Sequence, residues 1–190
     1  MERISYLCGL GNPGKEYCNT RHNLGFTVLD SLAEKLNTTW KNAWGKAEIT
    51  DWYVQGREVV LVKPLTYVNL SGTVLKLFPG LQPSNILVIC DDINLELGTT
   101  RIRRSGGSGG HNGLESFEAH LGSKDYPRLR IGIGPPPDPS RWKDFVLGRF
   151  TDREMEILEQ TLPEAVKAVE TVVLSGIQEA MQTFNRRSVE

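Results

Sequence analysis

The sequence predicts an α/β fold in which one β-sheet lies between layers of α-helix. Short, almost wholly apolar runs alternate along the chain with segments whose apolar residues recur every three or four positions. Glycine and proline separate these segments, and this alternation is typical of buried strands with amphipathic helices packed on a sheet. The chain has 190 residues and no internal repeat, linker or low-complexity segment. We therefore expect residues 1–190 to form a single domain.

The first half of the chain supplies three strands and two helices. The run ISYLCGL is apolar enough for a strand buried on both faces, and LGFTVLDSLAEKL has the stripe of an amphipathic helix that ends near Asn37. A turn at Gln55-Gly56 joins two further strands. In order, the expected elements are a strand over 4–10, a helix over 23–36, strands over 47–54 and 58–63, and a helix over 68–78 with Leu70, Val74, Leu75 and Phe78 on one side.

The second half continues the alternation. The run NILVIC is another buried strand, and Asp91-Asp92 follows it directly. Pro163 suits the first turn of a long C-terminal helix whose apolar stripe runs from Ala165 to Met181. The expected elements are strands over 85–90, 99–103 and 129–133, a short helix that begins near Asn112, and the C-terminal helix.

Composition excludes several classes of protein. Apolar residues make up 39% and charged residues 24%, as in an ordinary globular protein, and no apolar run approaches the length of a transmembrane helix. Strand-like sequence begins at Ile4, which leaves no room for a targeting peptide. Three cysteines without a C-x-x-C spacing predict neither a disulfide framework nor a zinc site. We expect a cytoplasmic protein without metal or cofactor.

Charge is unevenly distributed although the whole chain has a net charge of only −1. Residues 98–150 carry nine basic and five acidic side chains, a local excess of +4, whereas residues 151–190 carry four and eight. The basic segment is a weak indication of a polyanionic partner. On charge alone, a solvated face that happens to be basic is the simpler explanation.

Four polar stretches that contain glycine lie next to predicted strand ends or helix starts. In an open α/β sheet, functional sites form beyond the carboxyl ends of the strands. We therefore expect these stretches to converge on one cleft together with Asp91. They are GLGNPG at 9–14, YCNTRHN at 17–23, KPLTYVNLSG at 63–72 and GGSGGHNG at 106–113.

Two common kinds of site fit these stretches poorly. The first stretch lacks the G-x-G-x-x-G spacing of a dinucleotide site, because Pro13 interrupts it. Ser71 is not part of a G-x-S-x-G nucleophile elbow, and Cys8 and Cys90 are explained as small apolar residues of buried strands. A covalent mechanism therefore has little support.

One histidine surrounded by carboxamides is the strongest indication of chemistry. His22 lies in a polar loop, and a neutral imidazole held by a carboxylate such as Asp91 can deprotonate water. Amide donors from Asn12, Asn69 and Asn112 can stabilise an oxyanion. Together they predict acyl transfer to water without a metal or a covalent intermediate. Taken singly, each asparagine is more simply explained as a turn former or a helix cap, and Asn112 with Glu115 resembles a capping pair.

A second histidine competes for the role of the base. His111 precedes Asn112 within the glycine-rich stretch 106–113. Its flank suits a loop that must lie close to another part of the molecule, so His22 remains the preferred base.

The motifs together resemble those of the bacterial-type peptidyl-tRNA hydrolases. Similarity runs from Ile4 to VLGRF at 146–150, and six ordered blocks over this length are far more specific than any one of them. The blocks are GLGNPGKEY, TRHNLGF, KPLTYVNLSG, the segment from Asp91 to Gly98, GGSGGHNGL and RLRIGIG.

The resemblance implies a mixed, twisted sheet sandwiched between helices, and hydrolysis of the ester that joins a peptide to tRNA. It implies that His22 activates water and Asp91 orients it. It also implies that Asn12 and Asn112 position substrate and water and that Asn69 lies on the oxyanion side. The remaining positions that it implicates in substrate or tRNA binding are Tyr17, Tyr67, Val68, Arg101 and Arg103.

The resemblance further implies a monomer that binds peptidyl-tRNA, with no membrane, cofactor or protein partner. Two features depart from the family. Val68 replaces the usual methionine, which puts affinity for the peptide in doubt, and the isoelectric point of about 6.3 is lower than in many relatives. Two other functions stay open: an RNA-splicing partner on the same scaffold, and an esterase or amidase for small molecules.

Overall fold

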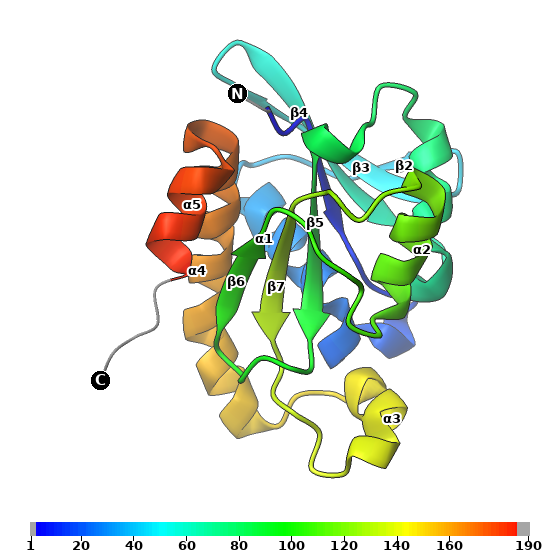
Figure 1. Cartoon of the computed structure of the whole chain (residues 1–190), viewed down its shortest axis with the longest axis vertical. Coiled ribbons are helices and arrows are strands. Elements are labelled where there is room, and N and C mark those ends of the chain that lie inside the picture. The colour runs from blue at the N-terminus through cyan, green and yellow to red at the C-terminus, as the bar shows by residue number, and fades with distance from the viewer. Residues whose placement is uncertain (1–2, 186–190) are drawn as a thin grey trace.

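A seven-stranded mixed sheet forms the centre of the molecule in a computed structural model that describes residues 3–185 (Figure 1). The strand order is β2-β3-β4-β1-β5-β7-β6. Strands β4, β1, β5 and β7 are parallel, whereas β2, β3 and β6 run antiparallel to their neighbours. The α/β class with a mixed sheet is confirmed. The strands are β1 (Tyr6–Gly9), β2 (Lys41–Ala43), β3 (Ala47–Val54), β4 (Arg57–Pro64), β5 (Ile86–Asp92), β6 (Thr100–Arg103) and β7 (Arg128–Gly132).

Residues 3–185 also form five α-helices and five 3₁₀ segments. The α-helices are α1 (Leu24–Lys35), α2 (Asn112–Leu121), α3 (Trp142–Leu147), α4 (Asp152–Ser175) and α5 (Ile177–Phe184). The 3₁₀ segments are η1 (Lys15–Tyr17), η2 (Arg21–Asn23), η3 (Val68–Leu77), η4 (Pro83–Asn85) and η5 (Pro139–Arg141). Of these, η5, α3, α4 and α5 follow the last strand. None of the helices in the described range is long and apolar enough to cross a membrane.

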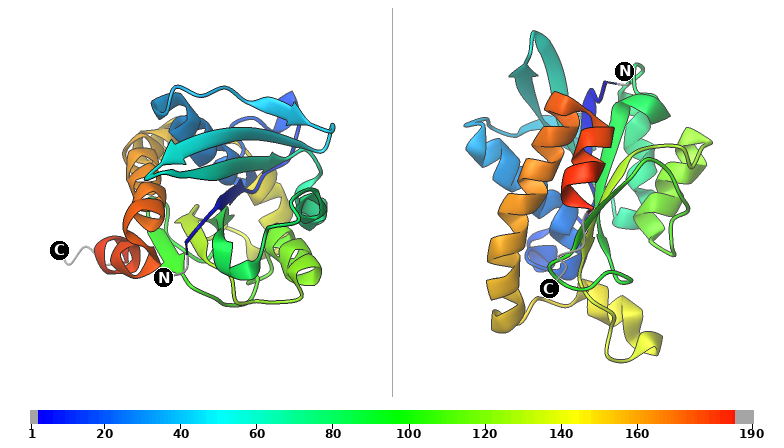
Figure 2. Two further views of the ribbon diagram at one scale, coloured as in Figure 1. Left: turned by 90° about the horizontal axis from the view of Figure 1, so that it is seen from above. Right: turned by 60° about the vertical axis from the view of Figure 1, so that its left-hand side comes forward.

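Helices cover both faces of the sheet (Figure 2), and an apolar layer is buried on each face. On one face, residues of α1, α4 and α5 pack against Leu7, Leu61 and Ile89 of the central strands. On the other face, residues of η3 and α2 pack against Cys8 and Val88. Alternate residues of one strand thus serve opposite layers, as the pleat requires.

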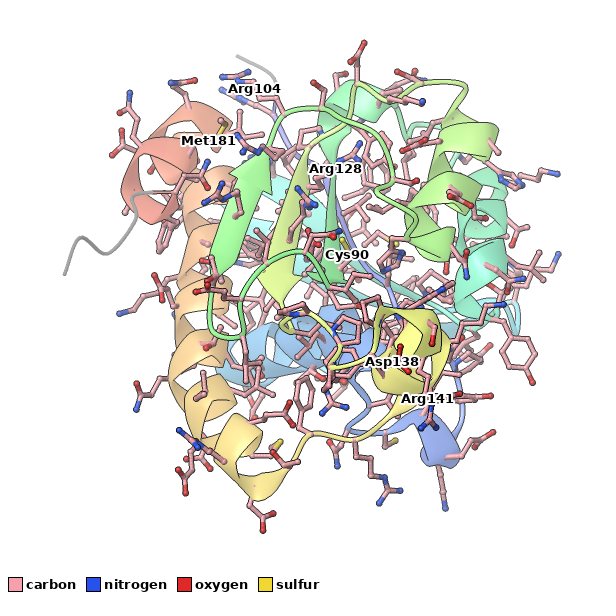
Figure 3. The ribbon with its side chains drawn as sticks, turned by 60° about the horizontal axis from the view of Figure 1, so that its bottom comes forward. Cys90, Arg104, Arg128, Asp138, Arg141 and Met181 are labelled. Carbon is pink, nitrogen blue, oxygen red and sulfur yellow. The ribbon has the colours of Figure 1, made fainter. Side chains whose placement is uncertain are left out.

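The carboxyl ends of β1, β4, β5 and β7 meet at one edge of the sheet, because these strands are parallel. Helix α3 lies across this edge, below the tips of β5 and β7 in Figure 1. Figure 3 looks at the same edge from below, with Cys90 of β5 near the centre and Asp138 and Arg141 on the segment that leads into α3. From the sequence, we expected Asp91 to follow this strand directly. In the structure, Asp91 belongs to β5 itself.

Two helix predictions were wrong in detail. The C-terminal helix begins at Asp152, where Thr151 and Glu154 form a capping box, so Pro163 lies inside it. It ends at Gly176, whose φ of 93° favours glycine, and α5 follows as a separate helix. Residues 68–77 are helical, but with 3₁₀ hydrogen bonding, and Leu70 is therefore exposed instead of facing the sheet.

Candidate active site

An open cleft of about 320 Å³ lies at the carboxyl edge of the sheet. It collects residues from four regions of the chain that are far apart in sequence: the segment between β1 and α1, the segment after β4, the start of α2, and α3. The residues that line this outer cleft are Asn12, Tyr17, His22, Tyr67, Val68, Asn69, Asn112, Trp142, Lys143, Val146 and Leu147.

A smaller cavity of about 30 Å³ lies deeper, and His22, Asn112, Trp142 and Val146 border both spaces. This inner cavity has room for one or two water molecules and is lined by enough polar groups to bind them. Asp91 and Arg130 border it from the sheet, and the glycine-rich loop closes it from above. The site thus has an outer space for a large substrate and an inner space of the size of water.

His22 occupies the middle of η2, the single turn that precedes α1. Gly25 lets this turn approach the sheet, since a Cβ at Gly25 would lie 2.4 Å from the backbone of Ile89 and Leu10. The His22 side chain is 5% exposed, and its Nδ1 lies 2.8 Å from Oδ1 of Asp91. A carboxylate can only accept, so Nδ1 carries the proton and Nε2 keeps a free lone pair.

Burial and charge act in opposite directions on this pair. Burial alone lowers the pKa of His22, but the charge and hydrogen bond of Asp91 outweigh it, so the pKa lies above the ordinary value. Burial alone raises the pKa of Asp91, but His22 and His111 outweigh it and hold the pKa far below its usual range. Asp91 is therefore ionised over the whole range in which a histidine titrates.

His111 donates a hydrogen bond to the same oxygen of Asp91. Its Nε2 lies 3.1 Å from Oδ1, and the two imidazole rings are 4.8 Å apart. Its Nδ1 accepts the N–H groups of Gly113 and Leu114, so His111 is the N-cap of α2. The idea that Asn112 caps this helix with Glu115 was wrong. Sequence reasoning treated His111 only as a competitor, because nothing local indicates that it shares a carboxylate.

The ligand atoms of His22, Asp91 and His111 lie within 4.8 Å of one another, a spacing that could hold a metal ion. The hydrogen bonds oppose this use. Because Nδ1 of His111 accepts two N–H groups, the neutral ring carries its proton on Nε2, the atom that would face the metal. The donor set fits two imidazoles that donate to one carboxylate better than it fits a metal.

Asn12 is held so that its amide nitrogen remains available. Its Oδ1 accepts the N–H of Val68 at 2.8 Å. Asn23, which sequence reasoning passed over, fixes the backbone of Asn12 on both sides, accepting its N–H and donating to its carbonyl. The loop after β1 is thereby locked to the start of α1 and to the start of η3.

Asn69 and Asn112 both border the outer cleft, from the neighbouring segments η3 and α2. Asn69 is the second residue of η3 and is exposed, and Asn112 is the first residue of α2 and is half-buried. Within the described residues, neither side chain makes a hydrogen bond, so both amides can bind a ligand. His22, Asn12, Asn69 and Asn112 thus converge on one space, as the sequence predicted.

Aromatic and apolar side chains form the rest of the outer cleft. Tyr17 and Tyr67 meet edge to face with ring centres 6.4 Å apart. Val68 is 6% exposed and packs closely against Gly113, where an added Cβ would lie 2.9 Å away from it. Trp142 and Val146 of α3 form the facing wall, which the sequence did not predict, because a six-residue helix has almost no periodicity to detect.

Arg101 and Arg103 lie outside the cleft, on β6 at the edge of the sheet. Their neighbours Thr100 and Ile102 are buried, so both arginines point to the opposite face. In the strand register, Arg101 lies opposite Arg130 and Arg103 opposite Arg128. Like charges placed directly opposite repel. Arg130 borders the inner cavity, so this basic face adjoins the cleft without being part of it.

Comparison with known proteins identifies the same family from the sequence. A family model described as peptidyl-tRNA hydrolase matches residues 6–190. Proteins named peptidyl-tRNA hydrolase from Fervidobacterium nodosum and Caldanaerobacter subterraneus subsp. tengcongensis are 43% and 44% identical over 182 residues. Each comparison covers 94% of this chain, and 94% and 98% of the two relatives respectively.

Comparison with solved structures identifies the same family as the sequence comparisons. The crystal structure of peptidyl-tRNA hydrolase from Acinetobacter baumannii matches with a TM-score of 0.90 at 35% identity, covering 97% of this chain and 96% of that one. A crystal structure of a peptidyl-tRNA hydrolase in complex with n-propanol matches equally well, with the same TM-score and identity. By sequence and by fold, this chain belongs to the peptidyl-tRNA hydrolase family and is an enzyme of that family.

Proposed function

We propose that this enzyme hydrolyses the ester between peptide and tRNA with a water molecule that His22 deprotonates, and releases free tRNA and peptide. The observation that carries the proposal is the hydrogen bond from His22 Nδ1 to Asp91. It fixes the tautomer whose Nε2 has a lone pair, at the boundary between an outer cleft and a cavity of the size of water.

The reaction needs only groups that the site contains. His22 Nε2 takes a proton while the water oxygen forms a bond to the ester carbonyl carbon, and Asp91 stabilises the resulting imidazolium. The tetrahedral intermediate then collapses, the bond to the ribose oxygen breaks, and His22 returns the proton to that oxygen. The products are a peptide carboxylic acid, which ionises, and a ribose hydroxyl. No covalent enzyme intermediate is required.

The amides are placed to bind the groups that change charge. Asn69 approaches the space beside His22 from η3, and we assign its N–H to the oxyanion. Asn12, whose oxygen is already bonded to Val68, has its nitrogen left to donate, and with Asn112 we assign it to positioning the substrate and the water. The hydrogen bond to Val68 already fixes the Asn12 amide, so this donor needs no reorganisation during the reaction.

Charge and shape suggest how peptidyl-tRNA lies on the molecule. Arg101 and Arg103 belong to a basic face that adjoins the inner cavity through Arg130, which suits the tRNA backbone. Tyr67 and Val68 line the outer cleft, which is the more open of the two spaces beside His22 and suits the peptide. Tyr17 contacts Tyr67 and completes the rim. The enzyme is proposed to act as a monomer in the cytoplasm, and its three cysteines are free thiols.

One assay separates this function from its rivals. Turnover of peptidyl-tRNA is compared with turnover of a peptide ester that has no nucleotide. A peptidyl-tRNA hydrolase strongly prefers the first substrate, whereas an esterase or amidase for small molecules has no use for the tRNA. A protein that binds tRNA tightly but turns over neither substrate would be an RNA-binding module, and the proposal would fail.

A further inference from the structure

Arg21 is buried beside His22, yet its side chain points away from the cleft. Its guanidinium donates to both oxygens of Glu154, at 2.9 and 2.7 Å, and to the carbonyl of Phe145 at 3.2 Å. It also lies over the rings of Phe145 and Phe150, with distances of 4.3 and 5.2 Å to their centres. One side chain thus joins the turn before α1 to the end of α3 and to the start of α4.

The backbone reinforces this connection. The N–H of Arg21 donates to the carbonyl of Gly148 at 3.0 Å, and Thr20 and Arg149 form an isolated antiparallel bridge. The turn that contains His22 and the chain that leaves α3 are therefore paired through both main chain and side chain. We define this set of contacts around Arg21, Phe145 and Glu154 as the Arg21 clamp.

The clamp matters for the cleft because α3 cannot hold its own position. Six residues are far too few for a stable helix in water, so its place depends on tertiary contacts. Its residues Trp142 and Val146 border both the outer cleft and the inner cavity, facing His22. Whatever fixes the end of α3 also sets the width of the space between this wall and His22.

Glu154 is the charged partner of the clamp. Burial alone raises the pKa of Glu154, but hydrogen bonds from Arg21 and Thr151 outweigh it, so the pKa lies below its ordinary value. The carboxylate is therefore ionised near neutral pH. It also accepts the N–H and hydroxyl of Thr151 at the start of α4. A buried ion pair adds little net stability, since desolvation offsets the attraction, and it is better explained by the geometry that it fixes.

We propose that Arg21 is a positioning residue for the hydrolysis reaction, acting through α3. By clamping the end of α3 to the His22 turn, it holds the wall of Trp142 and Val146 at the distance that fits the substrate. This role rests on the proposed function of the cleft. It predicts that loss of the clamp loosens α3 and weakens substrate binding, while the His22–Asp91 pair and the proton transfer are preserved.

The test compares Arg21→Lys and Arg21→Met with a matched control. Lys63 is also a buried cation, bound to Asp30 and Glu48 and stacked over Trp40 at 4.1 Å, but it borders neither the cleft nor the inner cavity. We therefore expect Lys63→Met to lower stability by removing a buried cation, as Arg21→Met does, without touching α3. Each variant is assayed on peptidyl-tRNA well below its unfolding temperature, and amide hydrogen exchange is followed at residues 142–148 and in β5.

For Arg21→Met we expect KM to rise about tenfold while kcat changes less than about threefold, as for loss of a uniform binding contact. Arg21→Lys keeps the charge but has one nitrogen in place of the two that bind Glu154 and Phe145, so it should fall between Arg21→Met and wild type. Exchange should accelerate at residues 142–148 and not in β5, and the pH dependence of kcat should not move. Lys63→Met should lower the unfolding temperature and leave KM and the exchange of α3 unchanged.

Two results would overturn the proposal. If the Arg21 variants behave as Lys63→Met does, Arg21 only stabilises the fold. If kcat falls and its pH dependence shifts with KM unchanged, Arg21 acts on His22 directly and not through α3. The exchange measurement needs no substrate, so it tests the clamp even if peptidyl-tRNA proved not to be hydrolysed.

Discussion

Asp91 is shared by two imidazole rings, and this sharing decides which of them can accept a proton. His111 uses both of its ring nitrogens, one toward Asp91 and the other toward the amides of α2. His22 uses only Nδ1 within the described residues. His22 is therefore the ring with a free lone pair, and His111 holds Asp91 in place.

This arrangement predicts the pH dependence of the reaction. The base must be neutral, and Asp91 raises the pKa of His22 above its ordinary value of about 6.5. kcat/KM should therefore rise with pH and level off only above that raised pKa. His22→Ala should lower kcat by about 10²–10⁴ without unfolding the protein. A variant that kept more than half of the wild-type turnover would contradict the role of His22.

Asp91→Asn tests the cause of the shift. Without the anion, burial is the main influence left on the pKa of His22, and burial lowers it. The rise of kcat/KM should therefore move to lower pH, while the plateau falls because the imidazolium has lost its stabilising charge. If the plateau value of kcat/KM fell but the pH at which kcat/KM rises stayed the same, the group that titrates would not be His22.

Asn12 allows a test in which the hydrogen bond to Val68 is kept and only the free donor is changed. Asn12→Asp can still accept the N–H of Val68, but it presents an oxygen anion where the amide N–H had been. Asn12→Ala loses both interactions. We expect the aspartate variant to be the more stable of the two and the less active, because its charge repels the developing oxyanion and the tRNA phosphates. Steady-state kinetics and thermal unfolding of both variants measure this. Equal or greater activity for the aspartate variant would count against the assignment.

At the scale of helices and strands, close packing of η3 on α2 brings the amides of Asn69 and Asn112 to the same cleft. Gly72 makes this possible, since an added Cβ would lie 2.2 Å from the carbonyl oxygen of Ser116. The N–H of Gly72 also donates to the Ser116 hydroxyl at 2.9 Å. The two segments are thus in backbone contact at this point.

Gly72→Ala should push η3 and α2 apart. Overpacking of this kind costs about 1–3 kcal/mol, and kcat should fall as well because Asn69 and Asn112 move apart. Gly107→Ala is the matched control, since an added Cβ there meets nothing within 4 Å. Denaturant unfolding and kinetics of both variants check this. If Gly72→Ala were as stable and active as Gly107→Ala, the close contact would not determine the site.

The elements also show where sequence patterns were sufficient. The hairpin of β3 and β4 was predicted within one residue, because its turn is local: Gln55 and Gly56 both adopt positive φ. The start of α4 was missed because Pro163 was given more weight than the capping box at Thr151 and Glu154. The 3₁₀ form of η3 could not be predicted, since it depends on contacts with α2, forty residues away in the sequence.

The residues of the site also fall into those that the sequence predicts and those that it does not. His22, Asp91, Asn12, Asn69 and Asn112 could be brought together from the sequence, because parallel strands deliver the segments that follow them to one edge. The residues that hold these side chains in place could not be predicted from the sequence. Arg21, Asn23, His111 and Trp142 act through contacts between distant segments, and an isolated sequence gives no sign of such a contact.

At the scale of the whole molecule, four arginines lie together on one face of the sheet, on the edge strand β6 and its neighbour β7. Arg101 and Arg103 project from β6 opposite Arg130 and Arg128 of β7. Arg130 pairs with Asp92, and Arg128 is buried and donates to the carbonyls of Gly107 and Lys124. Within the described residues, Arg101 and Arg103 are thus the members of this group that remain for a polyanion; Arg101 is half-buried and Arg103 is exposed.

Contacts between basic side chains and phosphates release counterions, so binding weakens as salt rises, with a log–log slope of about −0.7 to −0.9 per phosphate. Arg101→Glu combined with Arg103→Glu should raise KM on peptidyl-tRNA and flatten this slope by about 1.5. The same double variant should hydrolyse a peptide ester of a single adenosine at nearly the wild-type rate, because that substrate does not reach β6.

The control is Arg153→Glu combined with Lys167→Glu, which makes an equal change in net charge on the exposed side of α4, across the sheet. This control should leave the salt dependence of binding nearly unchanged. If both double variants flattened the slope equally, net charge and not the β6 face would attract the tRNA. If the β6 variant slowed both substrates to the same extent, its arginines would be structural and the tRNA would bind elsewhere.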